Sequence, residues 1–266
     1  MLRVINKVKM PRAVDTAKGN VQTFLERLLV EVAAGNYRHF LHEYVVLAGA
    51  AKPSPQPQYG CWPPLLAQER QVSGLFAGAL SSVCPVSRPE EAIRRIAARG
   101  DDDAAAESKS AVDSSGRIDF MALYASRHIG LEIKRHPISS ATDREHLEGL
   151  KTKWNAVSKQ AKQVLGHMRD IEDVYSNPVT VGLLVIRVSR KVRAGADLET
   201  ARVEAVSEMT STVELVKKTL KPRFLAVYKP PVEMQSFLGW GENGDEFRVF
   251  PGVIFAAAVH ARQSNR

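Results

Sequence analysis

Apolar and polar residues alternate along residues 129–134, which read Ile-Gly-Leu-Glu-Ile-Lys. A period of two residues is typical of a β-strand that buries one face, and it places Glu132 and Lys134 together on the other face. The preceding run, Arg117–Tyr124, is also rich in strand-forming residues. The four residues 125–128 between the two runs suit a hairpin connection. The pattern therefore predicts a β-hairpin with a glutamate and a lysine on one face.

The register of this hairpin decides which side chains meet. If Tyr124 pairs with Ile129, then Asp119 lies opposite Lys134 and diagonal to Glu132 on the same face. Diagonal neighbours in a sheet are roughly 7–8 Å apart at the backbone, which is close enough for two carboxylates to share a cation. A slip of one residue would send every side chain of one strand to the opposite face. The alternative is an exposed hairpin face with an ordinary ion pair.

The same periodicity analysis predicts the remaining elements. Asn20 as N-cap and Gly35 as C′ residue bound the first helix. Residues 99–116, which include the acidic run Asp101–Asp103, read as a loop. Helices are predicted over Val21–Ala34, Asp143–His167 and Asp197–Leu220, and strands over Pro178–Val188, Arg223–Tyr228 and Arg248–Val259.

This order of elements is an α/β order. We expect a mixed central β-sheet flanked by helices. With 266 residues and 44% hydrophobic content, the chain can form one large domain or a core with appendages. The Pro-rich segment Lys52–Pro64 separates an N-terminal helical segment, residues 1–60, from a core at residues 61–192. Residues 193–266 are expected to pack on this core as a helix and strands.

The carboxylate pair on the hairpin suits a hard divalent cation. Mg²⁺ takes oxygen ligands, usually one or two carboxylates together with waters and phosphate oxygens. Asp119 and Glu132 fit that role. The metal would polarise a phosphoryl group and lower the pKa of a bound water, and Lys134 would orient that water and offset charge in the transition state. The three residues predict phosphodiester hydrolysis.

The spacing of these residues resembles the signature of the PD-(D/E)XK, or restriction-endonuclease-like, nuclease superfamily over roughly residues 65–190. Asp119 is followed by twelve residues and then by Glu132-Ile133-Lys134 in an apolar strand. The resemblance implies metal binding by Asp119, Glu132 and the carbonyl of Ile133, water activation by Lys134, and products with a 5′-phosphate and a 3′-hydroxyl. It also implies an αβββαβ core. One strand of that core, before Arg117, has no clear counterpart in the sequence.

Many members of the superfamily add a glutamate from the helix before the sheet. Glu69 is the candidate here, because it shares a helical stripe with Val72, Phe76 and Leu80 and would lean toward the core. A carboxylate in that position needs a metal, a cation or a hydrogen-bond donor. The alternative is a first-turn glutamate that complements the helix dipole. Glu43 is a weaker substitute.

Further residues are candidates for contact with nucleic acid. Lys153, Gln160, Gln163 and His167 lie along one flank of the apolar stripe of the long helix. A glutamine on this helix approaches the active site in several branches of the superfamily, so Gln160 and Gln163 are candidates by resemblance. A solvated helix flank is the alternative for each. Arg135, next to Lys134 in sequence, completes the set.

The charge distribution also favours a polyanionic partner. Of the net charge of +8, residues 151–230 contribute +7, from 15 Lys and Arg against 8 Asp and Glu. Lys and Arg that neutralise phosphates supply most of the non-specific affinity for nucleic acid. The charge does not separate DNA from RNA, and solvated helix faces are the alternative explanation.

Other functional classes lack their key residues. The segment His39-Phe40-Leu41-His42-Glu43 matches no zinc motif in order or spacing. Cys61 and Cys84 show no metal-ligand spacing and predict no disulfide scaffold, which favours a reducing cytoplasm. There is no signal-like apolar region, no run long enough to span a bilayer, no Gly-x-Ser-x-Gly elbow and no phosphate-binding Gly-x-x-x-x-Gly-Lys loop.

The sequence therefore predicts a cytoplasmic nuclease, an endonuclease or exonuclease, that uses Mg²⁺ or Mn²⁺ on nucleic acid, with DNA as the first expectation. A catalytically inactive nucleic-acid-binding module with the same fold is the alternative, followed by an interaction protein with no nucleic-acid role. Any substrate specificity is expected to come from the N- and C-terminal additions, from a homodimer or from a partner protein.

Overall fold

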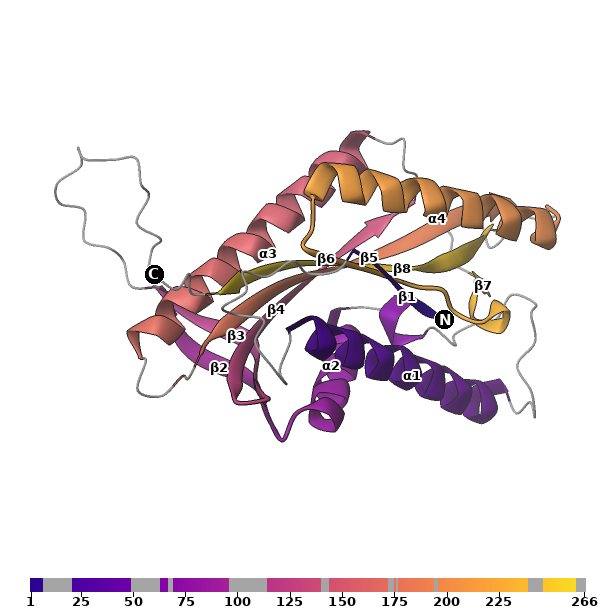
Figure 1. Cartoon of the computed structure of the whole chain (residues 1–266). Coiled ribbons are helices and arrows are strands. Elements are labelled where there is room, and N and C mark those ends of the chain that lie inside the picture. The colour runs from indigo at the N-terminus through magenta and orange to yellow at the C-terminus, as the bar shows by residue number, and fades with distance from the viewer. Residues whose placement is uncertain are drawn as a thin grey trace.

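The computed structural model describes residues 1–6, 21–48, 63–66, 69–95, 114–139, 144–171, 175, 177–193, 196–238 and 246–261. The chain is an α/β protein, and Figure 1 shows its helices on both sides of a curved sheet. The helices are α1 (Val21–Ala48), α2 (Glu69–Val83), α3 (Arg144–Asp170) and α4 (Leu198–Leu220), with short 3₁₀ helices η1 (Pro64–Leu66) and η2 (Val232–Met234). The strands are β1 (Leu2–Asn6), β2 (Val86–Arg95), β3 (Ser114–Tyr124), β4 (Arg127–Ile138), β5 (Val179–Arg193), β6 (Phe224–Tyr228), β7 (Ser236–Leu238) and β8 (Glu246–Ala261).

All eight of these strands belong to one mixed sheet. Seven follow the order β1-β6-β8-β5-β4-β3-β2, and β7 pairs with β8. The pair β4 and β5 is parallel, whereas the other described pairs are antiparallel. Helices α1 and α2 cover one face of the sheet and α3 and α4 cover the other (Figure 1). The expected mixed sheet flanked by helices is therefore present.

Each face of the sheet has its own apolar core, because side chains alternate between the two faces along each strand. On the α1/α2 face, Phe24 and Phe76 join a buried cluster that includes Leu131 and Ile133 of β4. On the α3/α4 face, Val157 and Met209 join a cluster that includes Ile186. Glu132 and Lys134 alternate with Leu131 and Ile133, so they belong to the α3/α4 face.

The strand that the sequence left unplaced before Arg117 is β2. From α2 to β5 the elements therefore follow the order helix, three strands, helix, strand. Strand β2 reads VSRPEEAIRR and ends the strand order beside β3. Pro89 and the charged residues are typical of an edge strand, where they discourage pairing with another chain, and they hide the usual strand pattern. Of the predicted loop, residues 99–116, the acidic run Asp101–Asp103 lies outside the described residues, whereas residues 114–116 already belong to β3, so the predicted end of the loop was wrong.

The predicted hairpin between β3 and β4 is present, but its predicted register was wrong. Tyr124 pairs with Arg127, not with Ile129, because the connection is the two-residue turn Ala125-Ser126. Both turn residues have positive φ, 47° and 65°, as a type I′ turn requires. Sequence gave no Asn-Gly or Asp-Gly signal for this turn. The shift of two residues preserves which side chains share a face.

Helix α1 extends through Gly35 to Ala48, so the predicted end at Ala34 was wrong. A Cβ on Gly35 would lie 2.8 Å from Cδ1 of Leu75, so this glycine allows α1 and α2 to approach closely. The expected N-cap, Asn20, lies outside the described residues. Helix α3 and strand β5 exceed their predicted C-terminal ends, Asp170 instead of His167 and Arg193 instead of Val188.

Strand β6 lies between the first and the last described strands of the chain. Strand β8 lies between β5 and β6, and β1 adds to the outer side of β6. Strand β1, with only five residues, was not predicted. The predicted C-terminal helix and strands correspond to α4, β6 and β8, which extend the sheet beyond β5.

Helix α3 is anchored to β8 along one flank. Ser158 Oγ lies 3.3 Å from Nε2 of His260, and Arg169 donates to the carbonyl of Ala261 at 3.2 Å. Burial of His260, together with the charges of Lys162 and Arg223, lowers its pKa to about 4. The fold therefore holds this imidazole neutral.

Because of His260, we expect the protein to become less stable as the pH is lowered. Its ordinary pKa is 6.5, so between pH 6.5 and pH 4 the unfolded chain binds a proton that the folded chain does not. The free energy of unfolding should decrease over that window by up to about 3 kcal/mol. Urea denaturation at several pH values measures this. His260→Gln should flatten the dependence, whereas His42→Gln on an exposed position of α1 should leave it unchanged.

Candidate active site

Asp119 lies where β3 and β4 stop pairing. The paired register runs from Tyr124 and Arg127 to Phe120 and Leu131. Beyond this last pair, the backbone N–H of Ile133, two residues after Leu131, donates to Oδ2 of Asp119 at 2.7 Å. The carboxylate thus occupies a position where a neighbouring strand would supply an acceptor. Continuing the register places Asp119 opposite Glu132, instead of diagonal to it as predicted.

This hydrogen bond also orients the carbonyl of Ile133. In an extended strand the N–H and C=O of one residue point to the same side, as the two bonds of an antiparallel pair show. Because the N–H of Ile133 points toward Asp119, its carbonyl points to that side as well. Glu132 precedes Ile133, and its side chain is 2% exposed beneath the α3/α4 face. Two carboxylates and one carbonyl are therefore brought together.

Glu132, Lys134 and His136 form a row on the α3 side of β4. Lys134 is half-buried, whereas His136 is 8% exposed. Nε2 of His136 lies 3.0 Å from the carbonyl of His146 in the first turn of α3, which identifies Nε2 as the protonated nitrogen. Burial lowers the pKa of His136, so it is neutral at pH 7.

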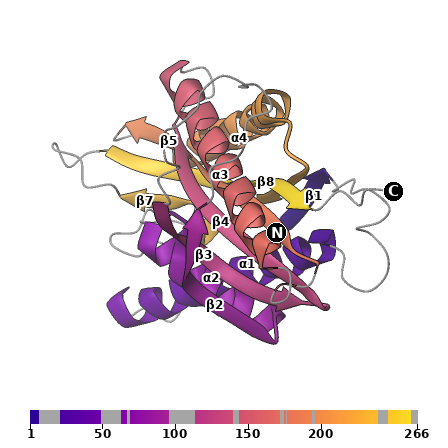
Figure 2. The same cartoon turned by 90° about the vertical axis from the view of Figure 1, so that its left-hand side faces the viewer.

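Helix α3 lies along this row, and Figure 2 shows it crossing the sheet over β4 and β5. A Cβ on Gly182, the register partner of Glu132, would lie 2.8 Å from the carbonyl oxygen of Val157. One on Gly130 would lie 3.0 Å from Cγ1 of Val164. The stretch of α3 from Val157 to Val164, about two helical turns, therefore passes beside Glu132.

That stretch of α3 carries Gln160. Ser158 and Arg169 mark the flank of α3 that faces β8, and Gln160 lies on the opposite flank, toward β3. Oε1 of Gln160 is buried and has no hydrogen-bond partner among the described residues. Gln163 shares this flank and is half-buried. Both predicted glutamines are thus on the side of α3 that borders the site.

Lys153 and Arg135 lie on different sides of the sheet. Lys153 is exposed on α3, and its charge contributes to the lowered pKa of His136, which places it near the His136 end of the row. Arg135 follows Lys134 and points to the α1/α2 face. There, burial and the charges of Arg135 and Arg248 lower the pKa of Arg187 to about 10. The structure therefore separates Arg135 from the carboxylate pair.

The two glutamates proposed as an additional metal ligand, Glu69 and Glu43, both lie on helices of the α1/α2 face. Glu69 is the first residue of α2, which packs on the α1/α2 face, and its side chain lies outside the described residues. Val72, Phe76 and Leu80, its predicted stripe partners, are buried as expected. Glu43 pairs with His39 on α1, with Oε1 and Nδ1 3.4 Å apart.

The donor set fits a hard cation such as Mg²⁺. Asp119, Glu132 and the carbonyl of Ile133 supply oxygen ligands only, and the remaining positions would fall to water and substrate. No group of three His, Cys, Asp or Glu side chains suited to a metal is found in the described part of the chain. Coordination by protein here would therefore depend on two carboxylates and a backbone oxygen. Cys84 is a buried free thiol whose pKa burial raises to about 11, and Cys61 lies outside the described ranges.

Sequence reasoning missed His136. The signal was available, because residues 132, 134 and 136 continue the same alternation and share one face. His146 and Ser139, whose Nε2 and Oγ lie 3.3 Å apart, complete a polar group around His136. That group depends on the packing of α3 against β4, which spacing alone does not reveal.

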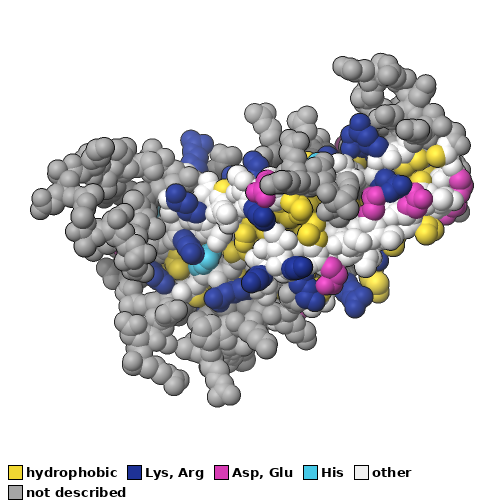
Figure 3. All heavy atoms as spheres, turned by 90° about the horizontal axis from the view of Figure 1, so that it is seen from above, with side chains coloured by type: hydrophobic (Ala, Val, Ile, Leu, Met, Phe, Trp, Pro, Cys, Tyr) yellow, Lys and Arg dark blue, Asp and Glu magenta, His cyan; other side chains and the backbone are white. Residues whose placement is uncertain are grey.

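Positive charge extends over the α3/α4 side of the molecule. Figure 3 shows Lys and Arg side chains spread along this side, with acidic side chains gathered toward one end. Several basic residues of the positively charged region, residues 151–230, form ion pairs: Arg190 with Glu204 and Glu208, Arg202 with Glu199, and Lys217 with Glu214. Three exposed lysines of α3, Lys153, Lys159 and Lys162, have no ion pair among the described residues, whereas Lys151 pairs with Glu148.

No protein-family model matches the chain, and no match is found among curated proteins or solved structures. Within the described ranges, no helix is both long enough and apolar enough to cross a membrane.

Proposed function

We propose that the chain is a Mg²⁺-dependent nuclease of the PD-(D/E)XK type that hydrolyses phosphodiester bonds in nucleic acid, with DNA as the first expectation. The contact between Asp119 and the amide of Ile133 carries this proposal, because it brings both carboxylates and the carbonyl of Ile133 to the point where β3 and β4 part. The element order from α2 to β5 supports it, since it is the αβββαβ order that the resemblance implies.

The residues divide the chemistry among them. Asp119, Glu132 and the carbonyl of Ile133 would hold the metal, which supplies Lewis acidity at the phosphoryl oxygen. Lys134, on the same face as Glu132, would orient the attacking water and offset negative charge in the transition state. Gln160 borders the site and offers its buried amide to substrate or to Glu132. Lys153, exposed on α3 near the site, would neutralise a neighbouring phosphate.

The experiment is a cleavage assay on plasmid, linear and single-stranded DNA and on RNA, with Mg²⁺, Mn²⁺ or chelator. Wild type is expected to cut at least one of them in a metal-dependent way. Lys134→Ala should reduce the rate by about a hundredfold or more, because it removes charge stabilisation in the transition state. Lys159→Ala is the matched control, since Lys159 is exposed on α3 and away from the site flank.

Three results would contradict the proposal: no cutting by wild type, cutting that survives chelation, or full activity of Lys134→Ala. Metal-independent binding without cutting would favour the inactive nucleic-acid-binding module. Retained cutting by Lys134→Ala would show that the residue assignment is wrong even if the chain is a nuclease.

A further inference from the structure

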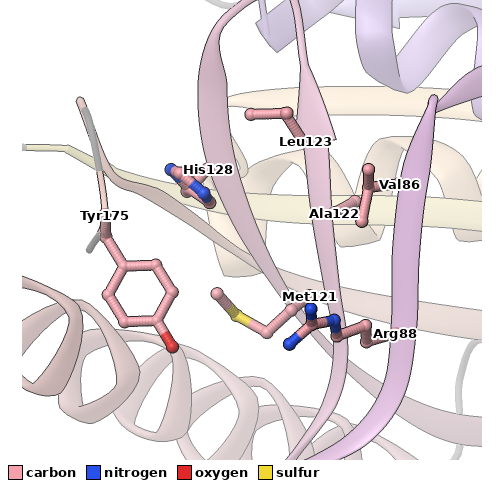
Figure 4. Close-up of a pocket in the computed structure, with 7 residues that line it drawn as sticks. All are labelled: Val86, Arg88, Met121, Ala122, Leu123, His128 and Tyr175. Atoms are coloured by element: carbon pink, nitrogen blue, oxygen red, sulfur yellow. The ribbon is translucent and has the colours of Figure 1, made fainter.

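A hollow of about 290 Å³ opens on the α3 side of the sheet, near the β3–β4 turn. It lies between the edge strand β2, the ends of β3 and β4, and the segment that follows α3. Figure 4 shows Tyr175 and His128 along one side, Arg88 reaching in from β2, and Met121 between them. The lining residues are Val86, Arg88, Met121, Ala122, Leu123, His128 and Tyr175.

The chemistry of this hollow suits a flat aromatic ring with a negatively charged group beside it. His128 and Tyr175 are arranged edge to face, with ring centroids 5.2 Å apart, and Met121 adds a soft apolar surface. Arg88 is exposed, and its planar guanidinium can stack on a ring or bind a phosphate. Aromatic platforms with a nearby cation are the usual means of holding unpaired bases.

The position of the hollow connects it to the proposed site. Met121 is the register partner of Gly130, on the face that carries Glu132. Glu132 comes four residues after His128 on β4, which corresponds to roughly 13 Å. The flank of α3 that carries Gln160 continues through Gln163 to His167, and Tyr175 follows the end of the helix. A strand leaving the site along this flank would reach the hollow.

We infer that this hollow binds one unpaired nucleobase of a single-stranded nucleic acid, with the adjoining phosphate on Arg88. The inference rests on the proposed function and names its substrate class, a nucleic acid with an unpaired segment near the scissile bond. A paired base cannot enter, because both of its faces are stacked within the duplex.

Binding can be measured without turnover. Fluorescence anisotropy of the Glu132→Gln protein would use a labelled 12-nucleotide thymidine homopolymer, the matching uridine homopolymer and a 12-base-pair duplex. Tyr175→Leu, which keeps apolar bulk but removes the ring, is expected to weaken single-strand binding by about 5- to 100-fold. Arg88→Gln should weaken it and reduce the salt slope by about one. Arg38→Gln, on α1, is the control.

Duplex affinity should remain the same in both variants. Single-strand affinity unchanged by Tyr175→Leu, no single-strand binding at all, or equal losses on duplex and single strand would overturn the inference. Its failure is distinct from failure of the proposed function. If wild type cuts nucleic acid and Tyr175→Leu has the same KM as wild type, only the inference about the hollow fails. If wild type binds single strands through Tyr175 but does not cut them, only the nuclease proposal fails.

Discussion

Glu132→Gln is expected to reduce metal-dependent cleavage by at least about a hundredfold while leaving the fold intact. Glutamine has the shape of glutamate, so it can occupy the same buried position without a cavity, but it lacks the negative charge that a cation needs. Asp119→Asn should have an equal effect. Its side-chain oxygen can still accept the hydrogen bond from the N–H of Ile133, which spans 2.7 Å in the wild type.

The assay for both variants is single-turnover cleavage in Mg²⁺, together with urea denaturation. Glu148→Gln provides the control, because Glu148 is exposed on α3 and its ion pair with Lys151, at 3.3 Å, is solvent-accessible. Surface pairs of this kind contribute little to stability. If Glu132→Gln or Asp119→Asn cleaves at the wild-type rate, the substituted carboxylate is not part of the active site. A rate loss explained by unfolding would make them structural residues.

Gly182→Ala is expected to destabilise the protein and to reduce cleavage together. A Cβ at this position would lie 2.8 Å from the carbonyl oxygen of Val157, which is backbone and cannot turn aside as a side chain can. Helix α3 must therefore move away from β5. Such overpacking costs about 1–3 kcal/mol in the free energy of unfolding. Because Glu132 is the register partner of Gly182, the shift would also disturb the site.

A second glycine provides the comparison for Gly182. Gly166 lies within α3, and a Cβ there would meet nothing within 4 Å. Gly166→Ala should raise the free energy of unfolding by about 0.5–1 kcal/mol, since alanine loses less backbone entropy in a helix. Urea denaturation and the cleavage assay test both variants. If Gly182→Ala is as stable and active as wild type, the close packing of α3 does not shape the site.

Local patterns predicted the central part of the fold. Alternation located β4, and helical periodicity located α3 and α4, because each element buries one face against the sheet. Patterns failed where tertiary contacts override them. Gly35 looks like a helix end in sequence, but it continues α1 because α2 packs against it. Strand β2 was missed because the proline and charges that protect a sheet edge also conceal the strand pattern.

The candidate site shows the same limit. The alternation of side chains between the two faces of the hairpin predicted that Asp119 and Glu132 lie on the same face. This prediction holds because the register differs from the predicted one by two residues, which leaves the faces unchanged. The contact of Asp119 with the amide of Ile133 could not be predicted, because it depends on where β3 and β4 separate. The position of Arg135 on the far face follows from the same alternation that joins Glu132 and Lys134. The hollow around Tyr175 combines three strands and a segment after α3, so no local pattern reveals it.

The central claim is that Asp119, Glu132 and the carbonyl of Ile133 surround one cation. Crystals soaked in Mn²⁺ and measured at the manganese absorption edge test this directly, because the anomalous signal locates the metal without reference to activity. We expect one strong peak between the two carboxylates, absent in Glu132→Gln crystals soaked in the same way. A peak elsewhere, or none at this position in wild type, would contradict the account.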